Sequence, residues 1–445
     1  MRLLNTLLAF GLILVLQTAN AQKQVEMNLK QCLEMVLKND QRVKMSEMDQ
    51  TRLKYQIQQT TGLGFPQVNG TGSFQNYLKL PTQLIPGEFF NQPGTLIPVQ
   101  FGTNYNMSGG IQVSQLIYNQ SFLVSLQISK RMIEQGNLEI EKNRENAAYD
   151  IAEMYYMAVL TGQQIRYLEE TLEKMDTLTN ITHIQLEKQL IRQVDFDRVN
   201  VNRNNLQTGL SNLKLMFSQQ LNMLKYFTGS SPNDSIILTT TVFDKGMMAL
   251  SLTNIENHLS LREIDQQKKL LNLQMDLVHS QNMPYLSAFG DFSYNSQQNE
   301  FAKLFNERKG WLGTSVVGLS LNVPIFSGGQ RYYQEKQYKV QFQELNLNRD
   351  YTKKLLETTS RNALLKVKSL EQTAVSQDKN VTLANDVYNV IFDQYSQGYA
   401  PLTDLLSAEN DKISAQSTYA QTLVQLRIAE LELIKSNGNF LDIIK

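Results

Sequence analysis

The sequence predicts a chain of mixed α and β structure, in which very long coiled-coil helices are joined to two pairs of membrane-type β-strands. Three observations carry this prediction. One long stretch of the chain contains no residue that breaks helices. Four short segments alternate apolar and polar residues, as strands with one face toward lipid do. These segments occur as two similar sets, which indicates an internal twofold repeat.

The longest predicted element is a helix over residues 330–397, which contain neither proline nor glycine. Proline breaks helices and glycine weakens them, so this stretch can form one continuous helix. At about 1.5 Å per residue it would extend on the order of 100 Å, further than one globular domain requires. Its apolar residues keep a heptad spacing, and the following segment repeats that spacing, which predicts coiled-coil packing. The predicted seam consists of Val367, Leu370, Ala374, Val381, Ala384, Tyr388, Ile391 and Tyr395, and then Leu405, Ala408, Ala415, Tyr419, Leu426, Ala429 and Leu433.

The repeat is visible in two pairs of matching segments. The sequence PQVNGTGSF at 66–74 recurs as PYLSAFGDF at 284–292, and Ile117-Tyr118 recurs as Ile325-Phe326. The two members of the first pair lie farther apart along the chain than the two members of the second pair do. The first half therefore has extra residues between its two segments, in a proline-rich loop at roughly 79–103, because insertions concentrate in exposed loops.

The segments beside these loops alternate in the way that strands do. In 105–113 the odd positions are apolar or small and the even positions are polar or small, and 317–323 follow the same rule. Segments 67–78 and 285–295 alternate less regularly. One face of such strands would suit lipid and the other water. Because small bacterial barrels need at least about eight strands, four strands per chain require oligomerisation.

The N-terminus has the pattern of a secretory signal. Arg2 precedes an apolar stretch from Leu3 to Leu16, and Ala19-Asn20-Ala21 forms a small-x-small cleavage site. We therefore expect a signal peptide over 1–21, a first structural repeat over 22–245 and a second over 246–445. Gln22 follows the predicted cut, so the mature chain offers no N-terminal cysteine for a lipid anchor.

Composition argues against several other classes of protein. Lys and Arg total 42, as do Asp and Glu, and no basic block indicates a nucleic-acid partner. The single cysteine, Cys32, has the spacing of a helical core position, and His183, His258 and His279 lie far apart in the sequence. The chain has no phosphate-binding glycine loop and no nucleophile elbow. We expect no enzyme activity, cofactor or metal site.

Two motifs resemble those of TolC-family outer-membrane efflux proteins. The segment VPIFSGGQR at 323–331 resembles the strand-to-helix junction of that family. Tyr395-x-x-Gly398, followed by the segment 404–408, resembles its helix hairpin at the periplasmic tip. The proline-rich loop is similar to that of members from Bacteroidetes-type bacteria. With the repeat and the signal, the resemblance covers nearly the whole mature chain.

The resemblance implies a homotrimer with four strands from each chain in one outer-membrane barrel, which lipid surrounds. A helical barrel would cross the periplasm and stay closed until a partner opens it. The implied partners are a periplasmic adaptor (membrane fusion) protein and an inner-membrane pump. The implied function is a passive export channel of a tripartite efflux pump or a type I secretion system. The alternative, a secreted coiled-coil structural or adhesive protein, explains the heptads but not the two strand pairs.

The junction motif also has a physical interpretation. Pro324 removes a backbone donor and so ends a strand ladder, while Gly328 and Gly329 permit the angles that turn a strand into a helix. In the first half, Leu116 stands at the position of the proline and Gln120-Ser121 at the positions of the glycines. That half is therefore expected to make its junction differently.

The resemblance also assigns residues to a periplasmic aperture at the second helix hairpin. Asp404 follows Gly398 at the spacing of the first aperture aspartate of the family, but Ser407 stands where the family has a second aspartate. The charged constriction would therefore be weaker here. A simpler interpretation of Asp404 is a helix N-cap, because Pro401-Leu402-Thr403-Asp404 begins a helix. The two roles are compatible.

A latch between inner and outer helix pairs is a second implication of the resemblance. Asp195 matches the aspartate of the family's latch, and Tyr395 matches its tyrosine partner. Ala400 stands where some members carry a basic latch residue, so that part of the latch is in doubt.

Overall fold

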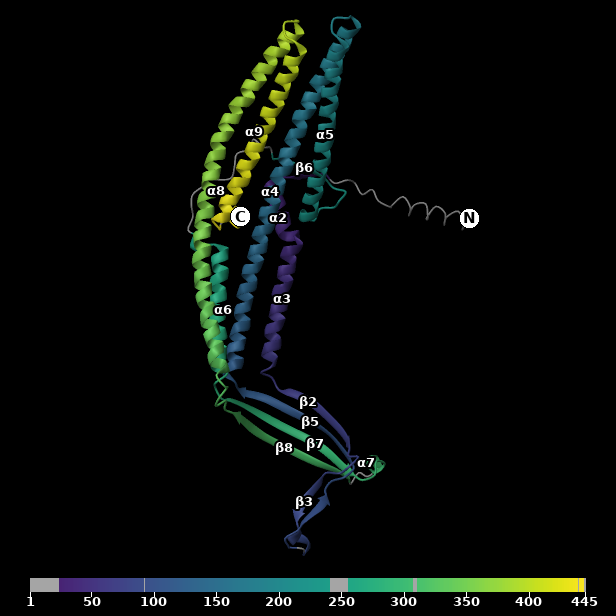
Figure 1. The fold of residues 1–445 in the computed structure, drawn as a ribbon, viewed down its shortest axis with the longest axis vertical. Coiled ribbons are helices and arrows are strands. Elements are labelled where there is room, and N and C mark those ends of the chain that lie inside the picture. Colours follow the sequence, from purple (N-terminus) through teal and green to yellow (C-terminus); the bar gives the residue numbers. More distant parts are fainter. Residues whose placement is uncertain (1–23, 92, 241–254, 307–309, 439, 444–445) are drawn as a thin grey trace, which may run out of the picture. The chain divides into compact units, whose positions relative to one another are not determined.

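The computed structural model describes residues 24–91, 93–240, 255–306, 310–438 and 440–443 (Figure 1). The chain is mostly helical with smaller sheets, as predicted, and forms two compact units that each combine both halves of the sequence. We call residues 1–49, 137–264 and 347–445 the helical unit, and residues 50–136 and 265–346 the sheet unit. The predicted signal peptide and the predicted boundary between 245 and 246 lie outside the described residues.

Two helices are exceptionally long. Helix α4 has 68 residues and α8 has 67, and each is followed by a helix of about half that length (Figure 1). The prediction of one continuous helix over 330–397 is confirmed, since α8 ends only at Ser396, just before Gly398 with a φ of +80°. Among the described residues, no helix combines the length and the hydropathy that a membrane span requires. The bounds are Gln120–Glu187 for α4, Gln193–Thr228 for α5, Gln330–Ser396 for α8 and Leu402–Ser436 for α9.

The predicted coiled-coil seams are confirmed by burial. Every seam residue of α8 and α9 is buried or half-buried, whereas most of the intervening residues of α8 are exposed. Near the two helix turns, the seams meet α4 and α5 in one apolar cluster, which fixes these four helices against one another. The buried members of this cluster are Met175, Leu178, Val199, Tyr388, Leu402, Leu405 and Ala408.

The largest core of the helical unit surrounds a short helix that carries Cys32. Helix α2 (Leu29–Asn39) begins with a capping box between Asn28 and Gln31. The side chain of Cys32 is fully buried, as predicted, and burial raises the pKa of its thiol to about 12. Strand β1 (Gln24–Met27) pairs in parallel with β6 (Ser235–Leu238), which the sequence analysis did not predict.

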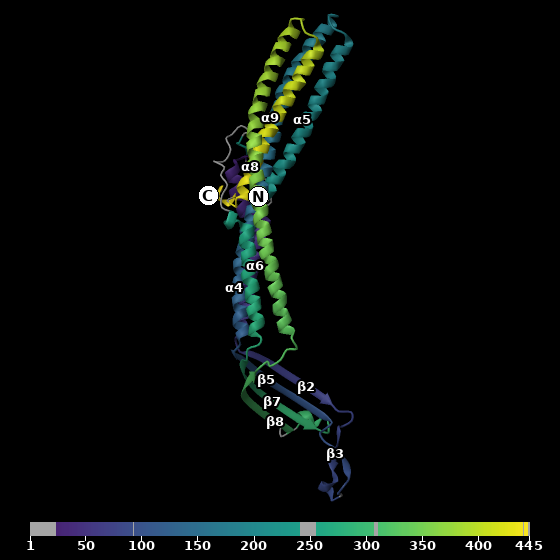
Figure 2. The ribbon, with the colours of Figure 1, turned by 60° about the vertical axis from the view of Figure 1, so that its left-hand side comes forward.

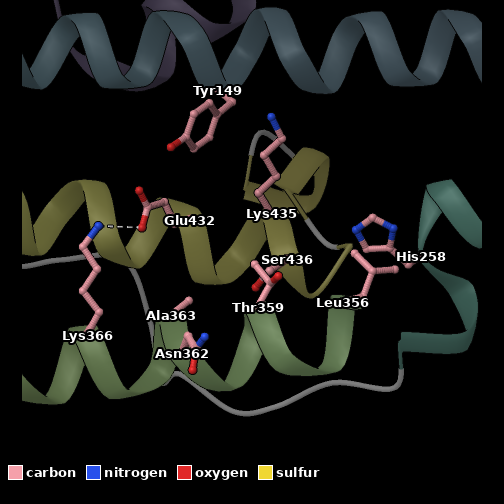
Figure 3. Close-up of a pocket in the computed structure, with 10 residues that line it drawn as sticks. All are labelled: Tyr149, His258, Leu356, Thr359, Asn362, Ala363, Lys366, Glu432, Lys435 and Ser436. Carbon is pink, nitrogen blue, oxygen red and sulfur yellow. Dashed lines mark hydrogen bonds and ion pairs between the residues drawn. The ribbon is translucent and has the colours of Figure 1, made fainter. Parts of the chain in front are cut away.

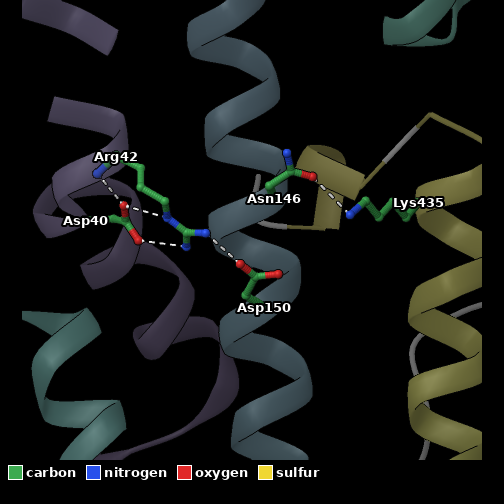
Figure 4. A network of polar contacts seen from close by, with 5 residues as sticks. All are labelled: Asp40, Arg42, Asn146, Asp150 and Lys435. Carbon is green, nitrogen blue, oxygen red and sulfur yellow. Dashed lines mark hydrogen bonds and ion pairs between the residues drawn. The ribbon is translucent and has the colours of Figure 1, made fainter. Parts of the chain in front are cut away.

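The chain turns between α2 and α3 (Gln41–Gly62) because Asp40 caps the N-terminus of α3. Its carboxylate accepts a hydrogen bond of 2.7 Å from the backbone N of Arg42. The Arg42 guanidinium bonds the same carboxylate and reaches Asp150 of α4 at 2.7 Å (Figure 4). Lys435 of α9 bonds Asn146 of α4 at 3.0 Å in the same region. This polar network ties α2, α3 and α9 to α4.

The sheet unit contains the four predicted strands in one antiparallel sheet of order β2-β5-β7-β8 (Figure 2). Helix α3 leads into β2, and α6 (Leu259–Ser280) leads into β7. In the part of the chain that the structure describes, no further strand pairs with β2 or β8, so these two strands are the free edges of the sheet. The bounds are Gln67–Asn76 for β2, Tyr105–Tyr118 for β5, Tyr285–Gln298 for β7 and Trp311–Asn322 for β8.

The register of the sheet collects the alternating residues on two distinct faces. Residues directly opposite in an antiparallel pair lie on the same face. Val68 pairs with Val113, which pairs with Gly290, which pairs with Val317. One face is therefore mainly apolar, with Phe74, Met107, Ile111, Val113, Leu286, Ala288, Phe292, Val317, Leu319 and Leu321. The other is mainly polar, with Asn69, Thr71, Ser73, Gln112, Ser293, Asn295, Thr314 and Ser320.

The connection between β2 and β5 contains structure that the sequence analysis missed. The sequence predicted only a long proline-rich loop at 79–103. The structure instead has an antiparallel hairpin of β3 (Thr82–Pro86) and β4 (Leu96–Gln100), with the 3₁₀ turn η1 (Gly87–Phe90) following β3. Pro86 and Pro98 misled the prediction because their nitrogens point outward from the two-stranded ribbon, where no ladder bond is lost.

Candidate functional site

The strand-to-helix junction of the second half turns on two glycines. Strand β8 ends at Asn322, shortly before Pro324, and α8 begins at Gln330. Gly328 has a φ of +64° and Gly329 a φ of +80°. A Cβ on Gly328 would meet nothing within 4 Å, so backbone conformation rather than crowding favours glycine there. This geometry is consistent with the turning role expected of these residues.

The first half makes its junction without glycine. Strand β5 ends at Tyr118 and α4 begins at Gln120. Asn119 caps the helix between them, since its side-chain oxygen accepts a hydrogen bond of 3.1 Å from the backbone N of Phe122. The ladder shifts register between Leu116 and Tyr118. A bulge and an asparagine cap thus stand where the second half has a proline and two glycines.

The helix turns of the helical unit bring together three of the predicted site residues, Asp195, Tyr395 and Gly398. A cavity of about 440 Å³ lies between the α4–α5 turn and the α8–α9 turn. Asp195 lines it from α5 and Tyr395 from α8, together with Gly398 and Ala400. The structure therefore brings the two predicted latch residues into one cavity, although they are 200 positions apart in the sequence.

Asp195 is held mainly by an arginine of its own helix turn. Its carboxylate accepts hydrogen bonds from the Nε and Nη2 atoms of Arg192 at 3.0 and 3.2 Å. These bonds hold the pKa of Asp195 below its ordinary value. Arg192 was not singled out from the sequence, although it stands three residues before Asp195 at the N-cap of α5, a spacing that could have indicated the pair.

Tyr395 reaches across the cavity to α4. Its hydroxyl donates to the side-chain oxygen of Gln185 at 3.4 Å. Burial and the nearby charge of Asp195 raise the pKa of the tyrosine. The hydroxyl is thus bonded to Gln185, while the aspartate acts on it through charge. No sequence motif pointed to Gln185.

Asp404 lies on the exposed surface of α9 and does not cap the helix. The N-cap is Pro401, which has no side chain that could accept a hydrogen bond, and Asp404 is the third residue of α9. Its carboxylate accepts only a 3.3 Å bond from the hydroxyl of Thr403 among the bonds of the described residues. The N-cap interpretation was therefore wrong. Ser407, about one turn further along, is exposed too, so both side chains face solvent on one side of the helix.

A buried cluster of charged residues lies next to this hairpin and was not predicted. Glu409 and Lys412 of α9 are only 2% and 4% exposed. The Lys412 ammonium lies 3.9 Å from the centre of the Tyr388 ring of α8, and Lys174 of α4 lies 5.4 Å from the same centre. Burial raises the pKa of Glu409 to about 7. A carboxyl group that titrates near neutral pH thus lies between three helices.

A second cavity, of about 480 Å³, lies between α8 and α9 with Tyr149 of α4 (Figure 3). Lys366 and Glu432 join the two helices along it at 2.8 Å. His258 lines one end and is buried, which lowers its pKa. Among the described residues, no group of three or more His, Cys, Asp or Glu side chains is arranged to hold a metal ion.

Comparison with known proteins supports the predicted family. Residues 252–439 match the family model described as outer membrane efflux protein. The outer membrane protein TolC of Vibrio cholerae is 22% identical over 240 residues, which are 50% of this chain and 52% of the relative. These matches, together with the solved structures below, indicate an outer membrane efflux protein of the TolC family. The aligned part of this chain spans about half the length of the Vibrio cholerae relative.

Solved structures show that the whole fold is that of TolC-like channels. The CmeC outer membrane channel of Campylobacter jejuni superposes with a TM-score of 0.72 at 16% identity, covering 93% of this chain and 86% of that one. The MtrE outer membrane channel of Neisseria gonorrhoeae gives 0.71 at 14% identity, covering 93% and 89%. The TolC family groups transport proteins rather than enzymes, and the alternative of a secreted structural or adhesive protein gains no support.

Proposed function

We propose that this chain forms an outer-membrane export channel, a passive conduit from the periplasm to the exterior in a tripartite efflux pump or a type I secretion system. The observation that carries the proposal is the register of the sheet, which separates an apolar face from a polar one. Such a sheet suits lipid on one side and a water-filled lumen on the other. The same fold is found in solved outer membrane channels, among them CmeC and MtrE.

The free edges of the sheet favour a homotrimer. Among the described residues, β2 and β8 each have one side without a pairing strand, and open sheet edges are not tolerated in hydrocarbon. Pairing β2 of one copy with β8 of the next removes both edges and closes one barrel from three chains. Val317, Leu319 and Leu321 of β8 are strongly exposed in the single chain and would face lipid.

The helical unit would form the periplasmic part of the duct. In this proposal the halves 22–245 and 246–445 are two structural repeats that follow a cleaved signal peptide. Threefold symmetry brings three copies of Asp404, Ser407 and Gly398 together around the closed periplasmic mouth. Asp195 and Tyr395 help to hold the mouth shut. A periplasmic adaptor and an inner-membrane pump would open it.

Planar-bilayer recording of the purified protein tests the function. A TolC-type duct should give discrete conductance steps, and these should be cation-selective if the Asp404 ring faces the pathway. Boiled protein serves as the control because heating destroys the oligomer. A folded preparation that never raises the conductance of the bilayer would overturn the proposal.

A further inference from the structure

The hairpin of β3 and β4, residues 82–100, extends beyond the ends of β2 and β5 within the sheet unit (Figure 2). We call it the outer hairpin. Its base is fixed by backbone bonds from Tyr77 N to Asn104 O at 2.7 Å and from Phe101 N to Pro81 O at 3.4 Å. It leaves the sheet next to β2, which is one of the two free edges.

Both faces of the outer hairpin are mainly apolar. Leu84 lies opposite Pro98, and Pro86 lies opposite Leu96. These four residues form the apolar part of one face, which also carries Thr82 and Gln100 at the base of the hairpin. We call it the Leu84 face; Leu84 and Leu96 are 62% and 63% exposed. The opposite face, the Ile97 face, consists of Ile85, Ile97 and Val99 with Gln83. A two-stranded ribbon has no interior, so neither face is covered by the other.

Water is a poor environment for such a ribbon. An isolated two-stranded hairpin is at best marginally stable in water without further packing. Between residues 77 and 104 the only charged side chains are Lys79 and Glu88. Glu88 accepts a hydrogen bond of 3.3 Å from Gly94 N, within the tip of the hairpin. At the same tip, Phe89 is 79% exposed. The composition is that of a surface that packs against another surface.

The prolines show how a partner can approach. The hydrogen bond from Gly87 N to Thr95 O shows that Gly87 and Thr95 form a hydrogen-bonded pair of the ladder. Hydrogen-bonded and non-hydrogen-bonded pairs alternate along an antiparallel ribbon, so Pro86–Leu96 and Leu84–Pro98 are non-hydrogen-bonded pairs. The nitrogens of Pro86 and Pro98 therefore point outward, where each removes a donor from the hairpin's edge. Addition of a further strand is disfavoured at such edges. A partner must therefore contact the side chains of the faces.

A ring of three copies matches this geometry. We infer that the outer hairpins of three chains pack on one another, the Leu84 face of each against the Ile97 face of the next, and cover the outer mouth of the channel. In a closed threefold ring each hairpin has two neighbours, one for each apolar face. The hairpin also leaves the sheet beside β2, at the subunit seam. The inference rests on the proposed trimeric channel.

Disulfide cross-linking tests the packing. Leu84→Cys and Ile97→Cys place thiols on opposite faces, so they cannot bond within one hairpin. After oxidation with diamide, the double variant should give several-fold more covalent dimer and trimer on non-reducing gels than either single variant. Cys32 is buried and should not contribute. Light scattering on the same samples separates the outcomes. A trimer without cross-links overturns this inference alone, and a monomer overturns the trimeric channel as well.

Conductance tests whether the hairpins cover the mouth. Leu84→Ser with Leu96→Ser weakens one face of each contact, and we expect a several-fold rise in the conductance of the assembled trimer. Thr82→Ser with Thr95→Ser is a matched control on the same hairpin and should leave conductance unchanged. If the double leucine variant assembles normally and conducts like the parent protein, the hairpins do not restrict the mouth.

A membrane-surface location is the alternative that a third measurement separates. Phe89→Trp in a Trp311→Phe background places the only tryptophan at the hairpin tip. In vesicles of brominated phosphatidylcholine its fluorescence should match that in unbrominated vesicles. Strong quenching by the brominated lipid would place the tips in the bilayer and overturn packing between hairpins.

Discussion

Replacing Glu409 by glutamine should remove a pH-dependent weakness from the helical unit. Glu409 is 2% exposed between α4, α8 and α9. The charged groups that act on it are Lys412 of its own helix and Lys174 of α4, which both favour its ionised form. Burial outweighs them and raises the pKa of the carboxyl from 4.5 to about 7. Ionising Glu409 is therefore harder in the folded protein than in the unfolded chain.

The size of the change in the free energy of unfolding follows from the linkage between protonation and folding. The folded protein holds the proton more tightly, so the contribution of Glu409 is most favourable below pH 4.5 and is lost as the pH rises to about 7. Because one pKa unit corresponds to about 1.4 kcal/mol, the loss is about 3 kcal/mol per chain at pH 8. Glu409→Gln keeps the shape of the side chain and cannot ionise. The variant should therefore be more stable than the parent at pH 8 and nearly equal to it at pH 4.5.

Thermal unfolding followed by circular dichroism in detergent, at pH values from 4.5 to 8, measures this effect. The melting temperature of the parent should fall across this range relative to that of Glu409→Gln. Asp411→Asn, an exposed carboxylate on the same helix, serves as the control and should follow the parent. A constant difference between parent and Glu409→Gln at all pH values would refute the reasoning.

The remaining predictions concern the junction and the mouth. Gly328→Val with Gly329→Val should lower trimer yield in detergent, since a positive φ costs a β-branched residue on the order of 1–2 kcal/mol; normal yield would contradict the turn. Asp404→Asn should lower cation selectivity and weaken block by multivalent cations from the periplasmic side, less strongly than in a channel with a second aspartate ring. Unchanged selectivity and block would exclude Asp404 from the mouth. Asp195→Ala with Tyr395→Phe should raise single-channel conductance about severalfold by loosening the two helix turns, and an unchanged conductance would count against the latch.

The long elements could be predicted because their signals are local. The absence of proline and glycine from 330–397 fixed the extent of α8, and the heptad spacing identified its buried seam. Alternation located all four strands of the sheet. The β1–β6 pair escaped prediction because two strands of four residues, about 200 positions apart in sequence, leave no periodic signal. The outer hairpin escaped it because Pro86 and Pro98 stand within its strands.

The candidate site was predictable only in part, for a different reason. Asp195 and Tyr395 were found through a family resemblance, and the structure places both in one cavity. Their bonding partners, Arg192 and Gln185, depend on how two helix turns meet, which a linear pattern does not encode. Glu409 lies in a polar stretch of α9, and only the packing of three helices shows that it is buried.

The mass of the protein in detergent tests the central claim most directly. Light scattering corrected for bound detergent should give the mass of three chains, with strand content retained by circular dichroism. We expect this result because, in the described part of the chain, β2 and β8 are sheet edges whose backbone groups need hydrogen-bond partners from neighbouring copies. A monodisperse monomer that keeps its strands would contradict it.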